Sequence, residues 1–215
     1  MKKLRRRKAL TFPFFLFLAL AFGSLSLLPE IGRAGGAPMA IGTKLETFTL
    51  ADTDGKQRKF DDLKGKKGTI LVFLSTKCPF VNQFYKDRIG QMAKDFGSNG
   101  VNVVGINSNI TENEKAADIK TNAEEKGFAF PILIDQKSVI AAKLGATVTP
   151  EIYFFNAENK LVYRGAIDND KSGENITANY LKDAVDAVVA GKPVTKAETK
   201  GIGCGIKTPE SMNMK

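Results

Sequence analysis

An uninterrupted apolar run at residues 69–74 leads directly into the motif STKCP at residues 75–79. The run has the length and the β-branched content of a strand that is buried on both faces. Pro79 suits the first position of a helix, where the backbone N–H that proline lacks is not needed. The sequence therefore predicts a buried strand that turns at once into a helix, with Cys78 at the helix start.

Cys78 would lie under the unpaired backbone N–H groups of the first helical turn, at the positive end of the helix dipole. Both features stabilise a thiolate, which is the reactive form of cysteine. Lys77 would add a positive charge, and the hydroxyls of Ser75 and Thr76 could donate to the sulfur. A buried structural cysteine is the alternative, because free cysteine packs as a small apolar residue. The position between a strand and a proline favours the nucleophile.

Histidine is absent from the 215 residues, and only two cysteines are present. This composition excludes Ser-His and Cys-His catalytic pairs, and it excludes a four-cysteine metal site within one chain. No glycine-rich phosphate loop followed by Lys-Ser or Lys-Thr occurs in the sequence. We therefore expect no metal and no other cofactor. Thiol chemistry remains, and two cysteines can pair in an oxidising compartment.

The first 34 residues have the layout of a cleaved secretory signal. Six basic residues lie within residues 2–8, an apolar stretch covers residues 12–28, and Gly32 and Ala34 place small residues before a cut after Ala34. An uncleaved membrane anchor is the alternative, since the stretch is only slightly short of a membrane span. We expect export to the periplasm or the extracellular space, with membrane contact only through this segment if it stays uncleaved.

The formal net charge of +9 belongs mostly to this leader. Residues 1–34 hold seven basic residues and one acidic residue, which leaves 25 basic against 22 acidic residues, a net charge of +3, in the remainder. No basic cluster with interleaved aromatic residues occurs there. Nucleic acid is therefore not an expected partner.

The remainder divides into a linker at residues 35–42, one domain at residues 43–192 and a glycine-rich tail at residues 193–215 that contains Cys204. Within the domain, strands alternate with helices early and a hairpin and a helix come late, which predicts an α/β three-layer sandwich around a mixed sheet. The expected strands lie at 47–50, 58–60, 69–75, 101–106, 130–134, 152–155 and 161–163. The expected helices run from 78 to 96, from a capping box of Thr111 and Glu114 to 127, from 138 to 144 and through 181–188.

Thr149 and Pro150 come just before the strand at residues 152–155. With the Cys-Pro helix start, this order resembles the thioredoxin fold. The N-terminal hairpin extension and the extra segment at residues 128–146 resemble the larger redoxins of the AhpC/TSA (thiol-specific antioxidant) family. The resemblance covers about residues 43–192, which is most of the chain after the leader.

This resemblance implies a catalytic site around Cys78. In such proteins the proline that matches Pro150 is cis and packs beside the reactive cysteine. The expected site consists of Cys78 as the nucleophile, Cys204 as the candidate resolving thiol, and Ser75, Thr76, Pro79, Thr149 and Pro150 around them.

The motifs depart from both subclasses of the fold. Val81 stands where thioredoxins have the second cysteine of C-x-x-C, so no adjacent thiol can release a mixed disulfide. Peroxiredoxins place a proline and an arginine near the thiolate, whereas Leu71 replaces that proline. Arg164 is a candidate for the arginine, although a structural role at a strand end is favoured for it.

Cys204 lies in the tail segment GIGCGIK at residues 201–207. Its three glycines give the segment wide backbone freedom, which would let it reach and leave a site. Gly-Cys-x-Ile-Lys also resembles the tail of exported redoxins that have a Cys-Pro-x-Val site. We therefore expect Cys204 to resolve an oxidised Cys78, within the chain or across a dimer. A static disulfide formed once on export is the alternative.

The sequence thus predicts an exported thiol oxidoreductase whose partners are a thiol reductant or a protein disulfide. A peroxiredoxin-like peroxidase, in which Cys78 attacks a peroxide, is the second interpretation. The third is a non-catalytic thioredoxin-fold binding module, in which the two cysteines form a fixed staple and Cys78 is unreactive.

Overall fold

The computed structural model describes residues 38–109 and 114–208 of the chain. The predicted signal segment at residues 1–34 lies outside these ranges. Within them, no helix is both long enough and apolar enough to cross a membrane.

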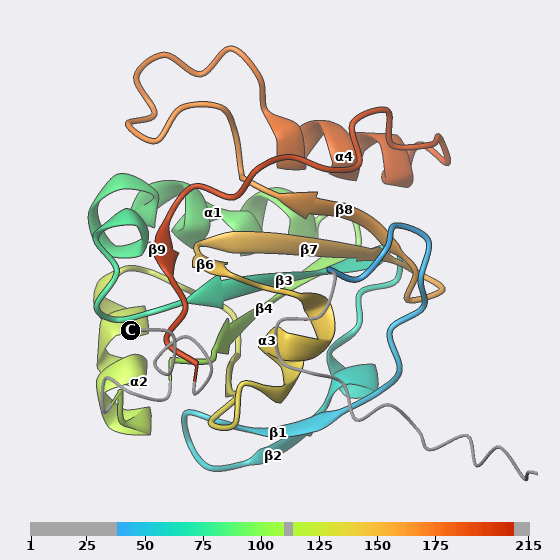
Figure 1. Cartoon of the computed structure of the whole chain (residues 1–215). Coiled ribbons are helices and arrows are strands. Elements are labelled where there is room, and N and C mark those ends of the chain that lie inside the picture. Colours follow the sequence, from blue (N-terminus) through green and yellow to red (C-terminus); the bar gives the residue numbers. More distant parts are fainter. Residues whose placement is uncertain (1–37, 110–113, 209–215) are drawn as a thin grey trace, which may run out of the picture. The chain divides into compact units, whose positions relative to one another are not determined.

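A seven-stranded mixed sheet forms the centre of the domain (Figure 1), with the strand order β2-β1-β5-β4-β3-β7-β8. The pairs β3–β4 and β4–β5 are parallel, and the remaining neighbours are antiparallel. The strands are β1 (Thr49–Asp52), β2 (Gln57–Lys59), β3 (Gly68–Leu74), β4 (Val101–Asn107), β5 (Ile132–Ile134), β7 (Glu151–Asn156) and β8 (Leu161–Gly165). All seven residues of β3 are buried, as the apolar run predicts.

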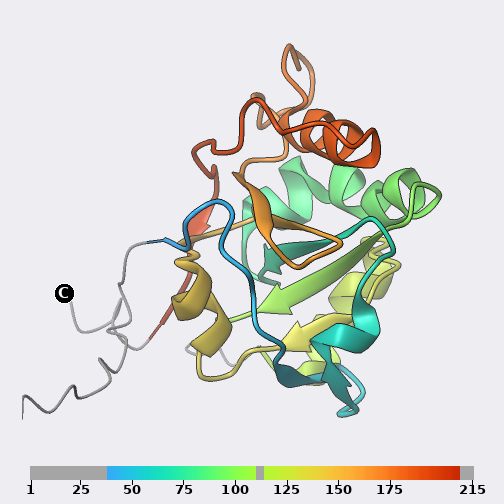
Figure 2. The same ribbon diagram turned by 90° about the vertical axis from the view of Figure 1, so that its right-hand side faces the viewer.

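Helices cover both faces of the sheet, which confirms the predicted three-layer sandwich (Figure 2). Successive side chains of β3 point to opposite faces. Ile70 and Val72 therefore join one core and Leu71 and Phe73 the other. The first core includes residues of α1 (Lys86–Gly97), α2 (Ala116–Glu125) and α4 (Tyr180–Val189), and the second includes residues of α3 (Val139–Leu144) and of the 3-10 turn η1 (Phe60–Leu63).

The helix that starts at the Cys-Pro motif differs from the prediction of one regular helix. A π-helical turn, η2 (Phe80–Phe84), comes before α1, and the Tyr85 N–H donates to the Phe80 carbonyl at 2.9 Å. The Asn82 side chain explains part of this difference, because its amide bonds back to the carbonyls that precede the helix instead of facing solvent. Short π-helical segments are frequent at functional sites.

The capping box predicted from Thr111 and Glu114 is wrong for Glu114, and Thr111 lies outside the described residues. The helix α2 begins at Ala116, and its N-cap Lys115 makes no side-chain cap. The Glu114 carboxylate bonds instead to the turn before Cys78 and to β4. Three donors outside the helix thus satisfy the carboxylate, whereas a capping box would offer it only one.

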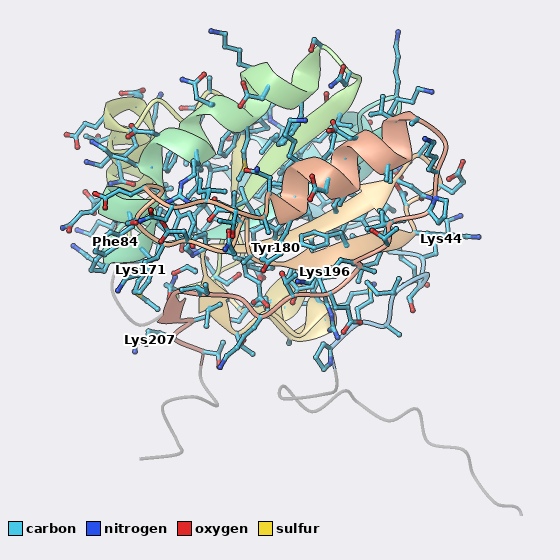
Figure 3. All side chains as sticks on the ribbon, turned by 90° about the horizontal axis from the view of Figure 1, so that it is seen from above. Lys44, Phe84, Lys171, Tyr180, Lys196 and Lys207 are labelled. Carbon is cyan, nitrogen blue, oxygen red and sulfur yellow. The ribbon has the colours of Figure 1, made fainter. Side chains whose placement is uncertain are left out.

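The described part of the tail packs against the domain along β8 and α4, as the red segment of Figure 1 shows. The Thr199 hydroxyl accepts a hydrogen bond from the Ala166 N–H at 2.9 Å. The Lys196 ammonium lies 4.2 Å from the centre of the Tyr180 ring, a pair labelled in Figure 3. The tail then forms β9 (Cys204–Gly205), which pairs antiparallel with β6 (Val148–Thr149) in a separate two-stranded sheet.

Candidate active site

Cys78 lies at the point where β3 turns into the helix, as predicted. Its carbonyl accepts the Asn82 N–H at 3.0 Å, which is the first bond of the helix. Its side chain packs into the first core, and the residue is only 1% exposed. The sulfur is therefore held at the positive end of the helix and shielded from solvent.

A carboxylate from another part of the chain fixes the turn before Cys78. Glu114 accepts hydrogen bonds from the Ser75 hydroxyl at 2.6 Å, from the Thr76 N–H at 2.8 Å and from the Asn107 amide at 2.6 Å. The Ser75 oxygen in turn accepts the Lys77 N–H at 3.1 Å. These bonds connect the turn to β4, so the position of the sulfur depends on Glu114.

The expectation that the two hydroxyls donate to the sulfur is wrong. Ser75 donates to Glu114, and the buried Thr76 hydroxyl oxygen has no hydrogen-bond partner among the described residues. The sulfur of Cys78 instead lies 3.0 Å from the Thr149 carbonyl oxygen, which can accept its hydrogen. The peptide bond between Thr149 and Pro150 is cis, as the resemblance implies.

A buried carboxylate accepts hydrogen bonds from the loop that carries Thr149. Glu151 accepts the backbone N–H groups of Thr147 at 2.8 Å and of Val148 at 3.3 Å. Burial raises the pKa of Glu151 above its ordinary value, and the two N–H donors oppose this shift. Glu151 therefore helps to hold β6 in place.

Cys204 meets Cys78 across this loop. The register of β6 and β9 places Cys204 opposite Thr149, and the two sulfur atoms lie 2.7 Å apart, closer than unbonded sulfur atoms normally approach. Both cysteines are free thiols in the structure. Cys78 has one hydrogen and two possible acceptors, the Thr149 oxygen and the Cys204 sulfur.

The environment of Cys204 keeps it protonated at neutral pH. Burial and the adjacent Cys78 sulfur raise the pKa of Cys204 to about 11, while the Phe80 N–H and the Lys207 charge act in the opposite direction. In the state with two free thiols, Cys204 is therefore not the attacking thiolate. It can donate its proton when a neighbouring group leaves.

The segment around Cys204 is seated by specific contacts rather than left free. Ile206 is 5% exposed, lies in the second core, and its N–H bonds to the Thr147 carbonyl at 2.9 Å. The Lys207 N–H donates to the Asn109 side chain at 3.0 Å. Gly203 lies against the Thr149 carbonyl so closely that a Cβ could not fit. At this position the glycine allows a close backbone approach, whereas the sequence predicts a freely moving segment.

Arg164 has the structural role that the sequence favours. Its guanidinium pairs with Glu198 of the tail at 3.0 Å, and its backbone bonds to Ala197 and Thr199. Four polar side chains of the site were missed by the sequence interpretation: Asn82, Asn107, Glu114 and Glu151. Only Glu114 has a sequence signal, and that signal predicts a helix cap.

Comparison with known proteins places the chain among thiol redox proteins. Residues 41–164 match the model of the AhpC/TSA family. The thiol-disulfide oxidoreductase ResA of Bacillus subtilis is 30% identical over 130 residues, which is 60% of this chain and 69% of ResA. The crystal structure of a hypothetical protein of Sinorhizobium meliloti is 31% identical with a TM-score of 0.73, and the match covers 80% of this chain and 96% of that one. The peroxidoxin BcpB of Mycobacterium tuberculosis shares the fold, with a TM-score of 0.55. It is 19% identical, and the match covers 71% of this chain and 97% of that one.

The matched residues include Cys78 and the Thr149–Pro150 bond, whereas Cys204 lies beyond them. The seven-stranded mixed sheet between two helical layers agrees with the fold of these relatives. This chain belongs to the AhpC/TSA family, as a thioredoxin-like redoxin of the thiol oxidoreductase class.

Proposed function

We propose that the protein reduces or exchanges disulfides with a two-cysteine centre, in which Cys78 is the nucleophile and Cys204 is the resolving thiol. The observation that carries the proposal is the 2.7 Å separation of two sulfur atoms that lie 126 positions apart in the sequence. Val81 occupies the place of a nearby second cysteine. Cys204 is the other cysteine of the chain, and it already lies within bonding reach.

In the proposed cycle, the Cys78 thiolate attacks one sulfur of a substrate disulfide and releases the other substrate sulfur as a thiolate. Cys204 then loses its proton and attacks the Cys78 sulfur, which releases the second substrate thiolate and leaves a Cys78–Cys204 disulfide. The substrate gains two electrons and the protein loses two.

Peroxide is the second candidate for the oxidant. The short distance between the two sulfur atoms would let Cys204 react with a Cys78 that a peroxide has oxidised. Attack of the Cys78 thiolate on a peroxide gives a sulfenic acid, and the leaving oxygen takes up a proton to become an alcohol or water. Condensation of the sulfenic acid with the Cys204 thiol then forms the disulfide and expels one water. Disulfide exchange is favoured because the Arg164 guanidinium pairs with Glu198 of the tail and is not available to polarise a peroxide at Cys78.

We also propose that the protein acts outside the cytoplasm, where disulfides persist. The support is the basic and apolar layout of residues 1–34. Cell fractionation of the full-length chain, with the mass of the mature N-terminus, tests this part independently of the chemistry.

The chemistry is tested by treating the reduced protein with one equivalent of either hydrogen peroxide or a small aromatic disulfide. Samples are quenched in acid at successive times, and the state of each cysteine is mapped by mass spectrometry. We expect a Cys78–Cys204 link within seconds, and faster with the disulfide. Cys204→Ser is the control, in which Cys78 should accumulate as a mixed disulfide or a sulfenic acid. A Cys78 that stays a free thiol with both oxidants would contradict the proposal and favour a binding module.

A further inference from the structure

Glu151 is a buried carboxylate beside the cis proline, and no step of the proposed cycle uses it. It begins β7 directly after Pro150, and only 9% of the residue is exposed. Burying a carboxylate in this way is costly unless hydrogen bonds or an opposite charge compensate it. The compensating contacts of Glu151 lie in the segments that bring the two cysteines together.

The first contacts are with the strand that pairs with the tail. One carboxylate oxygen of Glu151, Oε2, accepts both the Thr147 N–H at 2.8 Å and the Val148 N–H at 3.3 Å. The next residue, Thr149, lies opposite Cys204 in the register of β6 and β9, which run side by side in Figure 1. Glu151 therefore holds the piece of backbone against which Cys204 is placed.

The tail covers the other oxygen of Glu151. A Cβ added at Gly201 would lie 3.5 Å from Glu151 Oε1 and 2.7 Å from the Val148 side chain, so the tail backbone passes close to both. Farther along the tail, the Ile206 N–H donates to the Thr147 carbonyl at 2.9 Å. The Glu151 carboxylate thus lies between β6 and the tail.

Arg164 places a positive charge near the same carboxylate. Burial raises the pKa of Glu151, whereas the two N–H donors of β6 and the Arg164 charge act in the opposite direction. The Arg164 guanidinium also pairs with Glu198 of the tail at 3.0 Å. One cation therefore attracts a carboxylate beside the cis proline and a carboxylate of the tail.

We propose that Glu151 is a positioning residue for the resolving step, which holds Cys204 close to Cys78 through the backbone of β6. The inference rests on the proposed function, because it concerns how readily the chain forms the Cys78–Cys204 disulfide. Glu151 acts through its hydrogen bonds and takes no proton from either sulfur. Since one oxygen accepts both bonds, a neutral side chain that keeps this oxygen keeps the position.

The experiment measures the equilibrium between the two thiols and their disulfide. The full chain is equilibrated with mixtures of reduced and oxidised glutathione, quenched in acid and analysed by mass spectrometry. For each disulfide formed, Cys78 and Cys204 lose two electrons and two protons, and one glutathione disulfide becomes two glutathione thiols. The equilibrium constant of this exchange gives the effective concentration of one cysteine at the other.

Three variants separate the acceptor oxygen of Glu151 from its charge. Glu151→Gln keeps an oxygen that can accept both N–H groups, so the constant should stay within about threefold of that of the unsubstituted chain. Glu151→Met removes the acceptor at similar size, so the constant should fall by about tenfold or more. Glu151→Asp keeps the charge, but its shorter side chain cannot reach both N–H groups, so the constant should also fall. Glu151→Asp carries the test if Glu151→Met does not fold.

Glu158→Met, in the exposed turn between β7 and β8, is the matched control and should leave the constant unchanged. A constant that is also unchanged in Glu151→Met and Glu151→Asp would overturn the inference and leave the proposed function standing. This holds even if their unfolding midpoints in urea fall, because a purely structural role predicts that pattern. An equal fall in Glu151→Gln and Glu151→Met would overturn it as well, since the acceptor oxygen would then not suffice. If the unsubstituted chain forms no Cys78–Cys204 disulfide at any glutathione ratio, the inference and the proposed function both fail.

Discussion

Gly203→Ala tests whether the seated tail shields Cys78. A Cβ added at Gly203 would overlap the Thr149 carbonyl oxygen and would lie 3.1 Å from the Pro150 nitrogen. Both neighbours are backbone atoms, so the clash cannot be relieved by a rotamer change. Overpacking of this kind costs typically about 1–3 kcal/mol, which raises the population with an unseated tail by roughly 5- to 150-fold.

The assay uses a Cys204→Ser background, in which Cys78 is the only thiol, and measures its alkylation by iodoacetamide. If Cys78 reacts only when the tail lifts, its alkylation rate rises by the same factor of roughly 5 to 150. Gly205→Ala in the same background is the matched control, since its Cβ meets no atom within 4 Å. Equal rates in the two glycine variants would refute the reasoning. Equal unfolding midpoints in urea would show that the effect is local.

Other parts of the site give separate expectations. Glu114→Gln places an amide donor where three donors already point. The free energy of unfolding, measured in urea, should therefore fall by roughly 1–3 kcal/mol. The control Glu125→Gln, on the exposed side of α2, should lower it by less than about 0.5 kcal/mol. Thr199→Val leaves the Ala166 N–H without its acceptor. In this variant the backbone amides of the tail should exchange their hydrogens faster than those of the sheet. The raised pKa of Cys204 contributes stability that is complete below a pH of about 9 and is lost as the pH rises through about 11. The reduced protein should therefore become easier to unfold across that range, and Cys204→Ser should remove this part of the loss.

The fold could be predicted in detail because local patterns decide it. The apolar run of β3, the Cys-Pro helix start and the late hairpin each fix an element within a few residues. Expected bounds failed where a long-range contact overrides a local preference. Glu114 reads as a helix cap locally, yet it bonds to a turn 38 and 39 positions earlier in the chain. No periodicity or spacing encodes such a contact.

The tail shows why composition alone could not predict the geometry of the centre. A glycine-rich segment is equally consistent with a mobile arm and with a strand that passes close to another backbone. Two features of the fold decide between them: the approach of Gly203 to the Thr149 carbonyl, and the burial of Ile206 in the second core. Ile206 lies two positions after Cys204, so burying it fixes the register that sets the resolving sulfur opposite Thr149. The apolar contact of Ile206 thus helps to position Cys204 for its contact with Cys78.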